Sequence, residues 1–330
     1  MSSSRAILAE HDPGPGPRWA ALLCAICAVP LLLFGGSVTT LGAGMAVDGW
    51  WIAEGHFLLF FPVDQWFRDV PTFVEHTHRL FGVLVGLCAL TCFLLAWWRD
   101  PRRSARLSAL TALLAVCAQG ALGGLRVLAN DAQLAFLHGA LAQLVFALLC
   151  ANAVLLSRSW REEHCSAAAA EGKRRAVARA ALVAVVATSV QVVLGAWYRH
   201  GLRPSPAEGS GLRFLLHGLG ALLVIGTLAA LLRRAAALRA AETRLPAGFE
   251  RALLALPALL LVQLVLGGLS WAGFRPGTIG PAEWALSIAH VLGGALLFAA
   301  LGVCALWAQR LAAERALLPH ARSPALGGAA

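Results

Sequence analysis

The chain has 330 residues, of which 59% are hydrophobic and only 13% are charged. Its mean hydropathy of +0.71 is too high for a water-soluble domain of this length. The 27 Lys and Arg residues outnumber the 17 Asp and Glu residues, which gives a formal net charge of +10, but the basic residues gather in short segments between apolar runs. We therefore expect a membrane protein whose basic loops attract anionic lipid, and no binding of nucleic acid.

Eight apolar stretches are long enough to cross a bilayer as helices. They cover residues 19–41, 74–98, 106–128, 133–156, 176–198, 212–232, 251–272 and 283–307. The first stretch continues through "FGGSVTTLG" without a clear signal-peptide cleavage site, so we expect it to remain as an anchor. The predicted fold class is an all-α polytopic membrane protein with eight transmembrane helices.

The basic residues predict how the chain is oriented in the membrane. Lys and Arg are concentrated in "RDPRRSAR" after the second span, in "EGKRR" before the fifth, and between Arg233 and Arg251. The long loop at 43–73 instead holds four acidic residues and one arginine. Because basic loops stay in the cytoplasm, both termini are predicted to be cytoplasmic, in a bacterial-type inner (cell) membrane.

One phrase recurs in the odd-numbered spans, and a histidine follows it in each even-numbered span. The phrase is "LLLFGG" at 31–36, "QGALGG" at 119–124, "QVVLGA" at 191–196 and "QLVLGG" at 263–268. The histidines, each near the beginning of its span, are His78, His138, His217 and His290. The repeated unit is therefore a helical hairpin that occurs four times, and its glycines allow close helix packing.

Two hairpins make a four-helix bundle, so the repeat predicts two pseudo-symmetric bundles related by an axis along the membrane normal. The predicted boundaries are a cytoplasmic tail at 1–18, an N-terminal bundle at 19–157, a cytoplasmic linker at 158–175, a C-terminal bundle at 176–307 and a cytoplasmic tail at 308–330.

The four histidines lie at one predicted depth, about 7 to 12 Å inside the outer surface at 1.5 Å per helical residue. Any one of them could be a buried residue that is satisfied by a neighbour, but polar groups that recur within the bilayer are usually functional. As a set, two in each bundle, they are predicted metal ligands. A zinc ion would usually need a third or fourth protein ligand, whereas a haem needs one or two axial imidazoles and an apolar slot.

Haem propionates would need cations near the outer surface, and four arginines fall at that level. They are Arg79, Arg126, Arg199 and Arg213. Arg213 lies one helical turn before His217 and shares its helix face. Each arginine could instead be an anchor whose charged end reaches the membrane surface. We name them as candidate cofactor-binding residues.

The stretch "FVEHTHRLFG" (73–82) distinguishes the two halves of the chain. When His78 is aligned with His217, Glu75 falls opposite Phe214, so only the N-terminal bundle has a carboxylate at this place. Glu75 and His78 are three residues apart and share a helix face. Since a carboxylate beside a metal-bound substrate can act as a general acid or base, we expect catalysis in the N-terminal bundle and cofactor binding alone in the C-terminal one.

These motifs resemble those of the haem A synthase family of membrane oxidoreductases. "EHTHRLFG" (75–82) is similar to the E-x-x-H-R signature of that family, and "FGGSVTTLGAGMAV" (34–47) is similar to its glycine- and threonine-rich first helix. The histidines of "FLHG", "LLHG" and "IAHV", together with "QGALGGLRV" and "QLVLGG", extend the resemblance from about residue 20 to residue 307.

The resemblance implies that the C8 methyl group of haem O is oxidised to a formyl group in the N-terminal half, in haem A biosynthesis for terminal oxidases. Glu75, His78 and His138 would be the catalytic residues on the substrate side, and His217 and His290 the ligands of haem b, so all four histidines would bind iron. The expected partners are haem O, haem O synthase, an electron acceptor or donor, and membrane lipid. Some members carry a cysteine pair in an outer loop, whereas none of the eight cysteines of this chain lies in a predicted outer loop.

Two other functions agree with parts of the pattern. A b-type cytochrome that carries electrons between quinone and an outer partner would use the four histidines but would leave Glu75 without a role. A transporter built from repeats would use the glycines and the symmetry but not the histidines. We rank the enzyme first, the electron carrier second and the transporter third.

The orientation is testable with a fusion at the C-terminus. A reporter enzyme attached after Ala330 is expected to remain cytoplasmic, because eight crossings return the chain to the side on which it starts. The measurement compares a reporter that works only outside the cytoplasm with one that works only inside it. Activity of the outside reporter would contradict the prediction of eight spans.

Overall fold

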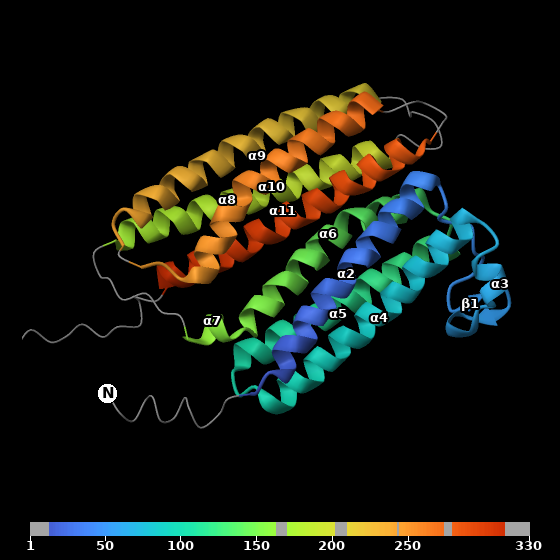
Figure 1. Ribbon diagram of the computed structural model, residues 1–330, viewed down its shortest axis with the longest axis horizontal. Helices are drawn as coiled ribbons and strands as arrows, with labels where there is room; N and C mark the ends of the chain where they lie inside the picture. Colours follow the sequence, from blue (N-terminus) through green and yellow to red (C-terminus); the bar gives the residue numbers. More distant parts are fainter. Residues whose placement is uncertain (1–12, 163–169, 202–209, 243, 274–278, 314–330) are drawn as a thin grey trace, which may run out of the picture.

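The computed structural model describes residues 13–162, 170–201, 210–242, 244–273 and 279–313. Within these residues, eight helices are long and apolar enough to cross a membrane (Figure 1). Their bounds are α2 (Gly16–Leu41), α4 (Val70–Arg99), α5 (Arg103–Leu128), α6 (Ala132–Leu155), α8 (Glu171–His200), α9 (Ser210–Arg239), α10 (Ala247–Gly273) and α11 (Pro281–Ala313). The predicted all-α polytopic membrane fold is confirmed.

Several helices continue beyond the predicted spans on the predicted cytoplasmic side. α8 begins at Glu171 rather than at 176, and α9 continues past 232 to Arg239. Hydropathy marks only the part of a helix that lies in hydrocarbon, whereas sequence rich in Ala and Arg also favours helix in water. The predicted linker therefore contains the short helix α7 (Arg158–Glu162) and the start of α8, and its residues 163–169 lie outside the described part of the chain.

The eight helices form two bundles that lie side by side (Figure 1). α2, α4, α5 and α6 pack into one bundle, and α8, α9, α10 and α11 pack into the other. The bundles meet through α2 and α6 of the first and α8 and α11 of the second, so each half presents its first and last long helix to the other. This reciprocal use of equivalent helices is what a two-fold pseudo-symmetry between the halves requires.

The second bundle is packed less evenly than the first. In the first bundle each helix packs against both of its neighbours, whereas α9 and α10 contact each other only sparsely. Near the end of that seam, Phe214 of α9 stacks on Trp271 of α10 with ring centres 5.9 Å apart. The seam between α9 and α10 is the loosest part of the helical framework.

Small side chains dominate the contacts between the helices. The core of the second bundle consists mainly of alanines and leucines packed with the buried rings of Phe249 and Trp307. A second core joins the bundles, because Phe146 of α6 and Phe298 of α11 pack in one cluster with residues of α2, α4 and α5. Close approach through small residues drives helix association in lipid, where apolar burial alone contributes little. The seven described cysteines lie in these helices and are unpaired, and Cys165 lies outside the described residues.

The segment at 42–69, expected as a loop, is a folded unit that we call the cap. It contains the strands β1 (Ile52–Ala53) and β2 (His56–Phe57), the 3-10 helix η1 (Leu58–Phe60) and the short helix α3 (Val63–Trp66). Glu54 and Gly55 form the two-residue turn between the strands with φ angles of 48° and 87°, as a primed hairpin turn requires. Val47, Ala53 and Phe61 form a small buried core beneath the turn. The cap lies at one end of the first bundle (Figure 1).

Polar contacts fasten the cap to the beginning of α4. The Asp69 carboxylate accepts a hydrogen bond of 2.8 Å from the backbone N–H of Thr72 and caps the first turn of the helix. This hydrogen bond to the charged form holds the pKa of Asp69 below its usual value. Arg68 donates to the Glu54 carboxylate at 2.7 Å and to the Ala46 carbonyl at 2.9 Å. The hydrogen bonds of Asp69 and Arg68 therefore fix the position of the cap on α4.

Candidate functional site

The four histidines lie in two pairs, one in each bundle. His78 of α4 lies beside His138 of α6, with ring centres 6.3 Å apart and an interplanar angle of 90°. His217 of α9 lies beside His290 of α11 at the same separation of 6.3 Å and an angle of 84°. The two halves of the chain therefore build the same arrangement of side chains, in agreement with the internal repeat.

A glycine of the recurring phrase lies directly against each imidazole ring. The four contacts join Gly35 to His78, Gly123 to His138, Gly195 to His217 and Gly267 to His290. A Cβ atom on the first three glycines would lie 2.8 Å from the Cε1 atom of the ring, and one on the fourth would lie 3.0 Å from it. These distances are shorter than carbon atoms pack in protein interiors. The imidazole thus occupies the space that any larger side chain would need, a more specific role than the general helix packing expected from the sequence.

A glutamine lies one turn before three of these glycines and contacts the same histidine. The pairs are Gln119 with His138, Gln191 with His217 and Gln263 with His290. In the first two pairs the amide nitrogen donates to the backbone carbonyl of the histidine, at 2.8 Å and 3.0 Å. Glutamine and glycine are four residues apart and so share a helix face.

The first hairpin has Leu31 in place of the glutamine, and there a backbone carbonyl oxygen, an acceptor, faces the histidine ring. The Nδ1 atom of His78 lies 3.1 Å from the Leu31 carbonyl oxygen. A neutral imidazole that donates from Nδ1 keeps the lone pair of Nε2 available for a metal ion. The ring of His78 is therefore oriented as a potential ligand.

The C-terminal pair contains buried polar atoms that no described residue satisfies. These atoms are the Nδ1 atoms of His217 and His290 and the Oε1 atoms of Gln191 and Gln263. Each unsatisfied buried polar atom costs about 1 to 3 kcal/mol, so native structures seldom keep several of them together. A metal-containing group bound between the rings would engage the imidazoles.

The separation of the rings suits one metal ion between two imidazoles. At metal–nitrogen distances of about 2 Å, two imidazoles on opposite sides of one ion have ring centres roughly 6 Å apart, and both pairs have 6.3 Å. In the part of the chain that the structure describes, no three His, Cys, Asp or Glu side chains gather to hold a bare ion. The pairs therefore fit haem iron, which needs only one or two axial imidazoles, better than zinc, which usually has a third or fourth protein ligand.

Glu75 is fully buried, one turn from His78, and both of its carboxylate oxygens accept hydrogen bonds. Oε1 accepts from the Arg79 guanidinium at 2.8 Å, and Oε2 accepts from the backbone N–H of Val47 at 2.9 Å. A second guanidinium, that of Arg126, lies 3.9 Å from Oε1. Two arginines and the cap backbone thus balance a negative charge that would be costly inside an apolar layer.

Arg79 and Arg126 bind the cap as well as the carboxylate. Arg79 donates to the backbone carbonyls of Val47 at 2.7 Å and Gly49 at 2.8 Å. Arg126 donates to the Gly44 carbonyl at 3.2 Å. The two candidate propionate-binding arginines of the N-terminal half therefore also fasten the cap to α4 and α5.

In two of the three double-glycine pairs of the recurring phrase, the second glycine contacts other elements, whereas a Cβ atom on Gly268 would meet open space. On α5, the indole ring of Trp50 from the cap lies where a Cβ atom of Gly124 would be, next to the glycine that contacts His138. On α2, the Gly36 carbonyl accepts a hydrogen bond of 2.6 Å from Arg199 of α8, which also donates to the Thr40 hydroxyl at 2.6 Å. Arg199, a candidate cofactor-binding residue, is thus a bridge between the bundles beside the first histidine pair.

The corresponding end of the second bundle is aromatic instead of acidic. Phe214, at the position equivalent to Glu75, stacks on Trp271. Arg213 donates to the Trp197 carbonyl at 3.3 Å, and its guanidinium lies 4.7 Å from the centre of the Trp197 ring. The sequence difference between the halves is therefore present in space as a hydrogen-bonded carboxylate on one side and stacked rings on the other.

His200, at the end of α8, was not predicted from the sequence as a site residue. Its Nε2 atom lies 2.9 Å from the position of a Cβ atom on Gly139, and its ring centre lies 6.2 Å from that of Phe136 on α6. His200 therefore lies between the bundles, close to His138. The other three hairpins have no histidine at this position, so the repeat gave no signal for it. The role of the three glutamines was also missed, although the recurring phrase contains them.

A known protein family matches the part of the chain that contains the first histidine pair. The sequence profile of the COX15-CtaA family, described as cytochrome oxidase assembly protein, matches residues 17–203. The chain belongs to the COX15-CtaA family. The match covers more than half of the chain and includes Glu75, His78 and His138. No curated protein sequence matches the chain.

Membership of the COX15-CtaA family implies a part in cytochrome oxidase assembly and haem A biosynthesis. The matched stretch ends after α8, so His217 and His290 lie beyond it. The internal repeat nevertheless gives them the same glycine contacts and the same ring separation as the matched pair. The resemblance to haem A synthases drawn from the sequence motifs is thus confirmed at the level of the family.

Substitution of a glycine tests its contact with the imidazole. Gly195→Ala is expected to displace the His217 ring and to lower the free energy of unfolding by roughly 1 to 3 kcal/mol, as overpacking of a tight site does. Gly226→Ala, also in a helix of this bundle, has open space around the new Cβ atom. Because alanine favours helix, this control is expected to be neutral or stabilising by up to about 1 kcal/mol. Thermal unfolding in one detergent measures both variants, and equal midpoints would contradict the contact.

Proposed function

We propose that this chain is a haem A synthase, which oxidises the C8 methyl group of haem O to a formyl group. The proposal rests on one observation: a buried, hydrogen-bonded carboxylate, Glu75, lies beside one of two otherwise matching histidine pairs. Phe214 occupies the equivalent position beside the other pair. Two sites that share their ligands but differ in one costly ionisable group are suited to two tasks, catalysis at the first and cofactor binding at the second.

In this proposal His217 and His290 hold haem b, and His78 and His138 bind the substrate haem O. When bound, the resident haem supplies one-electron redox chemistry to the site. The glycine and glutamine contacts fix the imidazole rings before any haem binds, so little orientational freedom is lost on binding. The candidate partners of the haem propionates are Arg79, Arg126, Arg199 and Arg213.

Glu75 would accept or donate a proton at one of its carboxylate oxygens during oxidation of the substrate. Each carboxylate oxygen accepts one hydrogen bond in the structure, from Arg79 or from Val47, and has a second lone pair that can take a proton. Arg126, 3.9 Å from Oε1, keeps a second positive charge close to the carboxylate.

The cap would exclude water from the substrate site. Its residues Gly44, Val47 and Gly49 are tied by hydrogen bonds to side chains of α4 and α5, and Trp50 packs against α5 beside the first histidine pair. Exclusion of water strengthens the electrostatic interactions of the carboxylate and suppresses side reactions of an oxidised substrate.

We place the enzyme in a bacterial-type inner membrane with both termini cytoplasmic, on the distribution of Lys and Arg between the loops. The proposed chemistry needs a source of haem O, one oxygen atom from water or dioxygen, and an electron acceptor or donor, so haem O synthase and a redox protein or quinone are the proposed partners. In this orientation both histidine pairs lie in the outer half of the membrane.

A b-type cytochrome that only carries electrons is the second candidate. The observation that favours it is the equal geometry of the two histidine pairs, which would suit two permanently bound haems. It assigns no chemical role to Glu75, which would then serve only to fasten the cap. The first experiment below tests the haem b site that both candidates share, and the second, on Glu75, separates the candidates.

Removal of an axial ligand should remove the resident haem. His217→Ala or His290→Ala is expected to abolish the spectrum of a six-coordinate b-type haem in the purified protein, because each variant leaves a single imidazole at that site. The control is His200→Ala, which removes a histidine outside both pairs and is expected to keep the spectrum. Retention of the spectrum in both pair variants would move the cofactor to another site.

Glu75 separates the enzyme from the electron carrier. Glu75→Ala is expected to leave haem b bound to the C-terminal pair, while conversion of haem O to haem A falls by roughly a hundredfold or more, as is typical for loss of a positioned acid or base. Haem O or a hydroxymethyl product should accumulate in cells, as measured by extraction and chromatography of the haems. Glu75→Gln keeps the shape of the side chain and tests whether the charge is required.

The matched control is Glu54→Gln, which removes a carboxylate from the Arg68 ion pair in the cap without contact to Glu75. It is expected to retain conversion, whereas equal losses in both variants would indicate that Glu75 acts only by fastening the cap. Conversion at the wild-type rate in both Glu75 variants would favour the electron carrier.

A further inference from the structure

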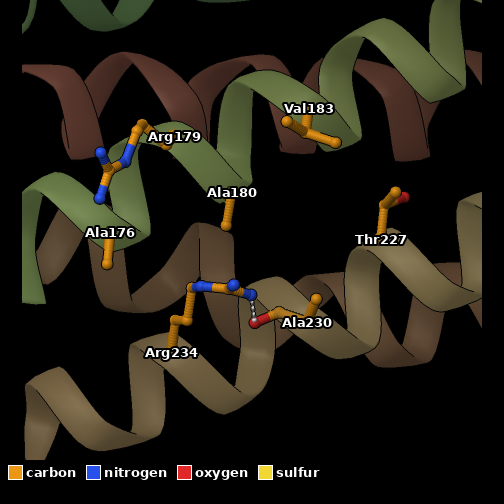
Figure 2. Close-up of a pocket in the computed structure, with 7 residues that line it drawn as sticks. All are labelled: Ala176, Arg179, Ala180, Val183, Thr227, Ala230 and Arg234. Atoms are coloured by element: carbon orange, nitrogen blue, oxygen red, sulfur yellow. Dashed lines mark hydrogen bonds between the residues drawn. The ribbon is translucent and has the colours of Figure 1, made fainter.

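A groove of about 420 Å³ runs along the surface of the second bundle between α8 and α9 (Figure 2). Its floor includes the small side chains of Ala176 and Ala180 on α8 and Ala230 on α9. The groove lies near the beginning of α8 and the end of α9, roughly 20 Å along the helix from His217 at 1.5 Å per residue. It is therefore separate from both histidine pairs.

The groove is cationic at one end and apolar at the other. Arg179 and Arg234 line the end nearest the helix termini, and Val183 and Thr227 line the end nearest the middle of the helices (Figure 2). The Thr227 hydroxyl donates its hydrogen bond within its own helix, so it offers no free donor to the groove. Arg233 lies beside Arg234 on the adjoining surface and adds a third positive charge.

These three arginines differ from the ion-paired arginines at the same end of α8 and α9. At the same end of the bundle, the ion pairs of α8 and α9 are Arg174 with Glu242, Arg175 with Glu171, and Arg239 with Glu250. Among the described residues, no carboxylate forms an ion pair with Arg179, Arg233 or Arg234. Arg234 donates only to the carbonyl of Ala230 in its own helix, at 3.3 Å. The groove thus presents positive charges that protein carboxylates do not balance.

We propose that this groove binds one anionic phospholipid of the adjacent leaflet. The phosphate would lie at Arg179 and Arg234, and one acyl chain would lie along the alanine floor toward Val183. The cationic end lies nearer the membrane surface and the apolar end lies deeper, which is the order of the phosphate and the acyl chain in a phospholipid. Basic pockets between spans on the cytoplasmic side are a known form of anionic lipid site, and the predicted orientation places the groove in the cytoplasmic leaflet.

A lipid fits the groove better than a free anion does. An inorganic anion would use the arginines alone and would leave the apolar part of the groove without an occupant. The lining is also continuous with the exposed apolar surface of α8 and α9, where Val186 and Leu223 face outward. A lipid that is already in this layer reaches the groove by lateral diffusion and buries both ends of it.

Native mass spectrometry of the full-length protein in detergent tests the proposal. The protein is titrated with dioleoyl phosphatidylglycerol and, separately, with dioleoyl phosphatidylcholine, whose headgroup has no net charge. We expect one phosphatidylglycerol molecule to bind at least tenfold more tightly than phosphatidylcholine, because the arginines favour the net negative charge. Equal affinities for the two lipids would overturn the proposal.

Two kinds of variant separate the charge from the shape of the groove. The double variant Arg179→Gln/Arg234→Gln is expected to weaken phosphatidylglycerol binding at least tenfold and to abolish the headgroup preference. Ala230→Leu fills the groove but keeps both arginines, and is also expected to weaken binding at least tenfold. The matched control is Lys173→Gln/Arg251→Gln, which removes two positive charges from exposed positions at the same end of the bundle but outside the groove.

The control is expected to bind phosphatidylglycerol within twofold of the wild type. An equal loss in the control and in the arginine variant would reduce the effect to overall charge and overturn the site. Displacement of the lipid by millimolar inorganic phosphate, with Ala230→Leu unchanged, would overturn it in favour of a simple anion site. If the arginine variant fails to fold, as judged by circular dichroism, the result for Ala230→Leu decides.

Discussion

The close contact between a glycine and an imidazole in each hairpin is the constraint on which the two sites depend. In lipid, helices gain little from burying apolar surface against each other, so they associate where small residues let backbones and side chains approach. Here the space left by the missing Cβ atom holds a histidine ring from the neighbouring helix. The same contact occurs four times, and both histidine pairs therefore have ring centres 6.3 Å apart. The contact that packs the hairpin also orients the candidate ligand.

The cap belongs to the N-terminal site because its backbone binds the buried charged groups there. A carboxylate inside the layer must find its partners within the protein, and Glu75 finds them in Arg79 and in the backbone N–H of Val47. Arg79 also donates hydrogen bonds to two backbone carbonyls of the cap, so α4 and the cap share one hydrogen-bond network. Glu75, the residue proposed for proton transfer, thus also holds the cap in place.

The two bundles are similar in framework and different in chemistry. Their interface uses the first and last helix of each half, and Arg199 crosses it to reach α2 at Gly36, next to the glycine that contacts His78. His200 enters the same interface beside the neighbour of His138. Equivalent histidine pairs therefore accompany a carboxylate in one half and stacked aromatic rings in the other, although α9 and α10 contact each other more sparsely than α4 and α5 do. The proposed lipid site lies at the opposite end of α8 and α9, where neither pair constrains the surface.

The sequence by itself determined the eight spans, the hairpin that occurs four times and the histidine of each hairpin. These features are local: hydropathy over a span and a phrase at fixed spacing need no knowledge of what lies opposite. It also determined that Glu75 has no counterpart in the second half, because alignment of the repeats compares positions directly. The ends of the helices were predicted less well, since hydropathy does not mark where a helix continues into water.

Only the tertiary structure decided which residues meet. The hydrogen bond between Val47 and Glu75 joins residues 28 apart in the chain, and that between Arg199 and Gly36 joins residues 163 apart. No periodicity relates such partners, because their contact depends on how whole helices and the cap are packed. For the same reason the cap was expected as a loop, the arginines were assigned only to a level in the membrane, and the groove between α8 and α9 had no signature in the sequence. The order of the residues determined the spans, the repeats and the types of candidate residue. The packing of segments far apart in the chain determined the surroundings of each charged group.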